Sequence, residues 1–131
     1  MQGRIYSSAF VLAASLALST AANAQQIGKA TSVKPEAHAN TRMLAPGIDV
    51  NANDTIRTGN TGVADLRFND SSNLSVGPTS VVHLNKFVYD PNKGSGSAVI
   101  EVSRGAFRFV AGSQGGNYTV KTPSGTLGIR G

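Results

Sequence analysis

The sequence predicts an all-β domain of short antiparallel strands, either a twisted solenoid-like coil or a sandwich, preceded by a helical signal peptide. Beyond the first residues, apolar side chains alternate with polar ones at a period of two. Turn-forming stretches interrupt this alternation at intervals of about seven to twelve residues, as in other all-β domains. Glycine is abundant and tryptophan is absent. Periodicity alone leaves both the solenoid and the sandwich open.

The first 24 residues have the three parts of a secretory signal peptide. Arg4 supplies the positive charge, an apolar run follows, and Ala22-Asn23-Ala24 matches the small-residue cleavage site. The apolar run is too short to cross about 30 Å of hydrocarbon. We therefore expect cleavage between Ala24 and Gln25, no transmembrane segment after it, and a periplasmic or secreted protein.

Three later stretches show the strand pattern most clearly. Residues 62–68 place apolar side chains on one face and charged ones on the other, and residues 96–102 and 105–110 repeat this arrangement. We expect further strands at 27–33, 55–58, 74–76, 81–84, 87–89, 118–122 and 126–129. Residues 34–49 are expected to form a long loop, and the glycine-rich stretch 112–116 a hairpin loop.

A set of short motifs resembles the FecR domain of bacterial periplasmic proteins. The resemblance begins with the sequence NDTIRTGNTGVADLRFNDSSNLSVGPTSVVHL at 53–84 and continues at 103–112, 118–123 and 128–131. It divides the chain into a signal peptide (1–24), a lead-in strand and loop (25–52) and a FecR-like β domain (53–131). The motif residues are Thr58, Gly59, Gly62, Asp70, Gly77, Pro78, Gly105, Phe107, Pro123, Gly128, Arg130 and Gly131.

We interpret these motif residues as turn and packing elements. Four of them stand at expected strand ends, where glycine permits a positive φ: Gly59, Gly62, Gly77 and Gly105. Asp70 can accept hydrogen bonds from nearby backbone N–H groups. The resemblance implies a twisted, solenoid-like all-β fold, the periplasm of a Gram-negative bacterium, and a role in sensing and binding.

The chain departs from the family's full-length regulators at both ends. The resemblance implies that those regulators consist of a cytoplasmic anti-sigma segment, then a transmembrane helix, and then the FecR domain. Here we expect a cleavable signal peptide in front of the domain instead. We expect any signalling to pass through another membrane protein. At the other end, the family usually continues after its G-[IV]-R-G motif, so we expect the domain to be incomplete at Gly131. An open edge strand there would invite self-association.

Residue types exclude several chemistries. The absence of cysteine removes disulfides, thiolate zinc sites and a cysteine nucleophile. Residues 49–54 begin like a calcium loop but carry Asp54 where glycine is expected, which favours a polar turn. His38 and His83 lie far apart in sequence, and we expect His83 on the wet face of its strand. We expect cross-strand ion pairs of the acidic residues Asp65, Asp70 and Glu101 with Arg67 and Arg108.

These observations predict a non-enzymatic domain without a catalytic residue, cofactor or metal ligand. We expect its partner to be a protein or an envelope polymer. The arginines and lysines are scattered without stacking aromatics, so nucleic acid is not expected. The best candidates for partner binding are Arg67 and Arg108, because guanidinium groups on one face can recognise anionic partners.

Overall fold

The computed structural model describes residues 25–90, 92, 95–112 and 116–130. The signal peptide predicted at 1–24 lies outside these residues, as does Gly131. Gln25, on the other side of the predicted cleavage site, is exposed, and its carbonyl accepts the N–H of Ala52. Among the described residues no helix is long and apolar enough to cross a membrane.

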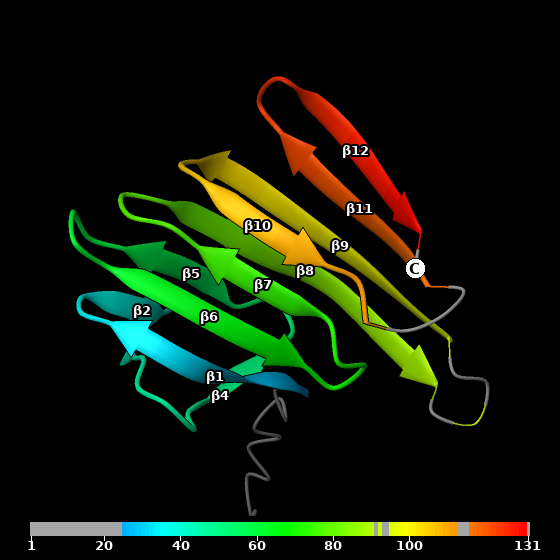
Figure 1. The fold of residues 1–131 in the computed structure, drawn as a ribbon, viewed down its shortest axis with the longest axis horizontal. Helices are drawn as coiled ribbons and strands as arrows, with labels where there is room; N and C mark the ends of the chain where they lie inside the picture. The colour runs from blue at the N-terminus through cyan, green and yellow to red at the C-terminus, as the bar shows by residue number, and fades with distance from the viewer. Residues whose placement is uncertain (1–24, 91, 93–94, 113–115, 131) are drawn as a thin grey trace, which may run out of the picture.

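Two open sheets make up the described part of the chain, and Figure 1 shows them as two layers. The five-stranded sheet has the order β10-β7-β6-β1-β4 and the seven-stranded sheet the order β12-β11-β9-β8-β5-β2-β3. The all-β prediction is therefore confirmed. The strands are β1 (Gln26–Lys34), β2 (Ala37–Ala39), β3 (Arg42–Met43), β4 (Asp49–Asn51), β5 (Thr55–Thr58), β6 (Val63–Phe68), β7 (Asn73–Val76), β8 (Val81–Asp90), β9 (Ser95–Arg104), β10 (Phe107–Val110), β11 (Asn117–Thr122) and β12 (Gly125–Arg130).

The core lies between the two sheets and is built from the alternating apolar residues. Ala64, Leu66 and Phe68 of β6 are all buried, as the period of two predicts. Aromatic rings join the layers, because Phe68 of β6 stacks on Phe87 of β8 at a centroid distance of 5.3 Å. β1 lies between β6 and β4, so the residues before position 53 also contribute to this core.

Three expectations about connections and strand direction are wrong. The expected loop at 34–49 contains β2 and β3, which pair with each other at the edge of the seven-stranded sheet. The stretch 112–116 is not a hairpin loop, because β10 and β11 belong to different sheets. The strands are also not all antiparallel, since β11 runs parallel to β9.

The expected strands at 81–84 and 87–89 form one longer strand. β8 is continuous from Val81 to Asp90, and its pairing with β9 shifts register between Leu84 and Lys86. Such an irregularity bends a strand without ending it. The polar residues between the two apolar stretches therefore mark a shift in register instead of a turn.

A buried polar cluster fastens the two sheets together beside β11. The Tyr118 hydroxyl donates to a carboxylate oxygen of Asp70 at 2.5 Å, and the other oxygen of Asp70 accepts the N–H of Ser72 at 2.9 Å. Tyr118 and Asp70 are 1% and 4% exposed. The expectation that Asp70 accepts a hydrogen bond from nearby backbone is confirmed. The expected cross-strand ion pair of Asp70 with Arg67 or Arg108 is wrong, because Asp70 is buried with Tyr118 and Ser72.

Close packing, and not a positive φ, explains the motif glycine Gly62. Of the four glycines expected to permit a positive φ, Gly105 alone has one, at 97°. At Gly62 an added Cβ would lie only 2.1 Å from the carbonyl oxygen of Glu36. At Gly59, by contrast, the nearest atom would be 3.6 Å away.

Replacing Tyr118 with phenylalanine retains the ring and removes the hydroxyl that donates to Asp70. We expect the free energy of unfolding to fall by about 1.5–3 kcal/mol, as for other hydrogen bonds to charged groups. Urea unfolding followed by circular dichroism measures the change. The matched control is Tyr89→Phe, because Tyr89 is only partly buried and its hydroxyl bonds to no other described residue. Equal losses in the two variants would contradict this account of the cluster.

Gly62→Ala and Gly59→Ala test close packing at one turn. We expect Gly62→Ala to lower the free energy of unfolding by about 1–3 kcal/mol, because the new methyl group forces Glu36 to move. Gly59→Ala has room for its methyl group and should change stability by less than about 0.5 kcal/mol. Thermal and urea unfolding of both variants provide the comparison, and a loss at Gly59 as large as that at Gly62 would refute it.

Candidate interaction face

The outer face of the five-stranded sheet carries both arginines that the sequence singles out. Arg67 on β6 and Arg108 on β10 are exposed, and each alternates with apolar neighbours that face the core. β7 lies between the two strands, so the arginines are separated by about two strand spacings, or roughly 10 Å across the sheet. We call this surface, with Lys29 on β1, the basic face.

Strand register shows what surrounds these cations. Arg67 is paired with Lys29 on one side and with Asn73 on the other. Arg108 is paired with Ser75, which is paired in turn with Asp65. On the basic face three cations therefore stand among small polar side chains and one carboxylate, that of Asp65.

The arginines of the basic face are not neutralised by ion pairs. The expected pairs of Asp65 with Arg67 and Arg108 are not formed, and neither arginine has an ion-pair partner among the described residues. Lys29 does contact the Asp49 carboxylate at 3.7 Å, but an exposed pair of this kind contributes little. Glu101 lies on the other sheet and accepts from the Asn85 side chain at 3.3 Å, so its expected pairing with an arginine is also wrong.

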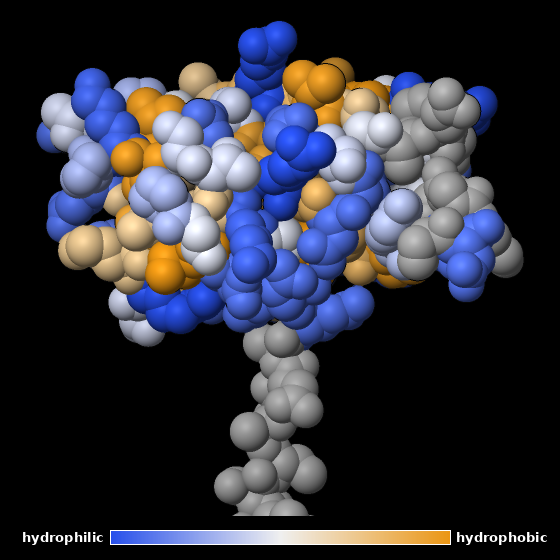
Figure 2. Space-filling view, turned by 60° about the horizontal axis from the view of Figure 1, so that its bottom comes forward, coloured by the Kyte–Doolittle hydropathy of each residue, from blue (hydrophilic) through white to orange (hydrophobic). Residues whose placement is uncertain are grey.

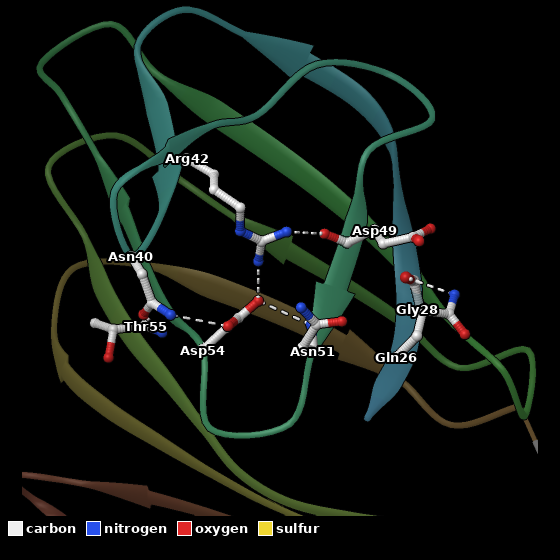
Figure 3. Close-up of polar contacts among 8 residues, drawn as sticks. All are labelled: Gln26, Gly28, Asn40, Arg42, Asp49, Asn51, Asp54 and Thr55. Carbon is white, nitrogen blue, oxygen red and sulfur yellow. Dashed lines mark hydrogen bonds and ion pairs between the residues drawn. The ribbon is translucent and has the colours of Figure 1, made fainter. Parts of the chain in front are cut away.

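Asp54, at the end of the calcium-like stretch, is the centre of a structural cluster (Figure 3). Its carboxylate is 3% exposed and accepts from the Arg42 guanidinium at 2.5 Å. It also accepts from the Asn40 amide at 2.9 Å and from the N–H of Asn51 at 2.8 Å. Both carboxylate oxygens are thus held by protein donors. The cluster ties the β2–β3 turn to the β4–β5 turn, as the polar-turn interpretation requires.

His83 lies half-exposed on the outer face of the seven-stranded sheet, as its alternation predicts. Its Nδ1 lies 2.9 Å from the Thr55 hydroxyl, and Glu101 is paired directly opposite it on β9. The sequence does not predict this group of three side chains, because strand register, and not local spacing, brings Thr55 and Glu101 beside His83. No group of three or more metal-binding side chains occurs among the described residues.

The motif residues fall into two structural groups. Thr58 is buried, and its hydroxyl donates to the carbonyl of Gly77 at 2.6 Å and accepts the N–H of Ser80 at 2.9 Å. Phe107 packs against the core, and the Pro78 carbonyl accepts from the Ser80 hydroxyl. The β11–β12 hairpin is different, because three motif residues on it are exposed: Pro123, Gly128 and Arg130.

Comparison with known proteins identifies the family. No curated protein and no solved structure matches the chain. The model of the family described as FecR protein matches residues 54–131, which is more than half of the chain and includes both arginines of the basic face. The chain therefore belongs to the FecR family.

Proposed function

We propose that this protein is an exported, non-enzymatic domain that binds an anionic macromolecule of the bacterial envelope through its basic face. FecR domains typically face the periplasm and belong to a signalling family. The observation that carries the proposal is that Arg67 and Arg108 lie exposed on one face of the five-stranded sheet, and neither has an ion-pair partner among the described residues. The signal peptide predicted at 1–24 would deliver the domain to that compartment.

The shape and charge of the basic face suit a polymer or a protein surface better than a small molecule. Its side chains between the cations are short and polar, so they leave the guanidinium groups accessible. Guanidinium groups bind carboxylate and phosphate oxygens in a bidentate manner. The net charge is +5, and only one of these charges, Arg4, lies in the predicted signal peptide, so the exported chain would remain cationic and would attract an anionic partner over a longer range.

Membership of the FecR family also suggests a second function, in signalling. As an accessory component of transmembrane signalling, the domain would act through another membrane protein. A structural or polysaccharide-binding role would instead place it on peptidoglycan or on a surface polysaccharide. These roles differ in the main partner that the domain retains, so one experiment separates them.

Charge reversal on the basic face tests the proposal. We expect Arg67→Glu and Arg108→Glu each to weaken capture of the main partner from envelope extracts by about threefold or more, as for loss of a charge-assisted contact. The matched control is Arg57→Glu, because Arg57 is also exposed but lies on the seven-stranded sheet. Quantitative affinity capture at two salt concentrations, followed by mass spectrometry and sugar analysis, measures the effect.

The outcomes of this experiment are distinct. A receptor or regulator lost by the two variants supports signalling, and a glycan lost by them supports a structural role. Equal capture by wild type, Arg67→Glu and Arg57→Glu would refute the basic face as the binding surface. Turnover of an envelope substrate by the purified protein would show that the domain is an enzyme.

A further inference from the structure

A shallow hollow lies between β7 and β10 on the five-stranded sheet. It has a volume of about 250 Å³, and its lining residues are Ser75, Gly77, Ala106, Phe107 and Arg108. Arg108 is one of the two arginines of the basic face, so the hollow adjoins a cation of the proposed binding surface. We call it the β7–β10 hollow.

Two small residues that face each other produce this hollow. Ser75 points outward on β7 and its pair Arg108 points outward on β10, so the alternation also turns Gly77 and Ala106 outward. The Gly77 N–H donates to the Ala106 carbonyl at 2.9 Å, and a Cβ added at Gly77 would lie 3.4 Å from the Ala106 Cβ. The surface here consists of backbone and one methyl group, so a small apolar group of a ligand can reach it.

Polar groups stand on one side of the hollow and define what can bind there. Arg108 is exposed, and the Ser75 hydroxyl has no hydrogen-bond partner among the described residues. Asp65 is paired with Ser75 on its other side, on β6, and its carboxylate would repel an anion placed there. An anionic group therefore fits beside Arg108, a neutral polar group beside Ser75, and an apolar group over Ala106.

We propose that the β7–β10 hollow is a subsite for an N-acetylated acidic sugar, as found in the glycan strands of peptidoglycan that have lost their stem peptides. This inference rests on the function proposed for the basic face. The sugar carboxylate would bond to the Arg108 guanidinium, the acetamido group to the Ser75 hydroxyl, and the acetyl methyl group would cover Ala106. Arg108 and Ala106 are two positions apart, or about 6.5 Å along the chain, which a sugar with these two groups on neighbouring ring carbons spans.

The second arginine of the basic face suits the next repeat of such a strand. Arg67 lies two strands from Arg108, or roughly 10 Å across the sheet. A strand with one acidic sugar in each disaccharide carries its carboxylates about one disaccharide length apart, which is comparable to this separation. One glycan strand can therefore contact both arginines, while only the sugar beside Arg108 has a hollow for its acetyl group.

The distribution of apolar side chains favours a glycan over a protein as the occupant. Among the described residues, the exposed large apolar side chains are Met43, Ile48, Val88, Val110 and Leu127, and only Val110 belongs to the five-stranded sheet. Figure 2 likewise shows orange patches separated by hydrophilic blue on the side it presents. The core of a protein interface is usually apolar and rich in aromatic residues. The basic face instead offers cations, short polar side chains and one small hollow, which match a polar polymer.

Three forms of one glycan test this subsite. The probe is a fluorescently end-labelled peptidoglycan strand without stem peptides, in which the carboxylate of each acidic sugar is free. In the second form these carboxylates are converted to amides, and in the third the N-acetyl groups are replaced by N-formyl groups, which lack the methyl group. Binding to the purified protein is followed by anisotropy. We expect amidation to weaken binding about tenfold or more, and loss of the methyl group to weaken it about fourfold.

Substitutions that fill the hollow provide the second test. Ala106→Leu places a larger side chain at an exposed position, and it should remove the preference for N-acetyl over N-formyl while the dependence on the carboxylate remains. Gly77→Ala fills the hollow less and should reduce the same preference only in part. The matched control is Ala45→Leu, because Ala45 is also exposed but lies between β3 and β4, far from β10 in the sheet order. It should leave all three affinities unchanged, and circular dichroism checks that every variant folds.

The outcomes separate this inference from the function on which it rests. Equal binding of the N-acetyl and N-formyl strands would overturn the subsite, although a loss on amidation would still support the basic face. Equal binding of all three forms would refute both.

Two further results would overturn the assignment of the sugar. The first is equally tight binding of hyaluronan of the same length, which carries its carboxylates and N-acetyl groups on separate sugars. The second is an absence of glycan binding together with an envelope protein that Ala45→Leu captures and Ala106→Leu does not, which would identify a protein as the occupant of the hollow.

Discussion

The buried hydrogen bond between Tyr118 and Asp70 fixes how the five-stranded sheet, which carries the basic face, packs on the seven-stranded sheet. Tyr118 belongs to β11 of the larger sheet, and Asp70 follows β6 of the smaller one. The bond therefore holds the sheets at a set distance beside β10. The Tyr118 ring also packs against Phe109 at a centroid distance of 5.0 Å, so the same residue helps to anchor β10, the strand that carries Arg108. A buried carboxylate is costly unless it is fully bonded, which favours this one arrangement over alternatives.

The buried carboxylate of Asp54 has a similar structural role near the other edges of the two sheets, where β3 and β4 lie. Asp54 joins the turns beside β3 and β4 through Arg42, Asn40 and Asn51. The chain has only 7 acidic residues, and these two are withdrawn from the surface as structural anchors. The outer surface is therefore poorer in acidic groups than the composition suggests. Asp70, one of the acidic residues expected to pair with Arg67 or Arg108, is therefore not available to them.

The period of the sequence predicts which face of a strand is buried, but not which sheet contains the strand. Leu66, Ile100 and Arg108 all point where alternation places them. The chain, however, crosses between sheets at most of its connections, so β10 and β11 separate although a hairpin fits their spacing. β2 and β3 are too short for a periodic pattern to show. The Thr55–His83 contact depends on register between strands that are distant in sequence, and no local motif records that register.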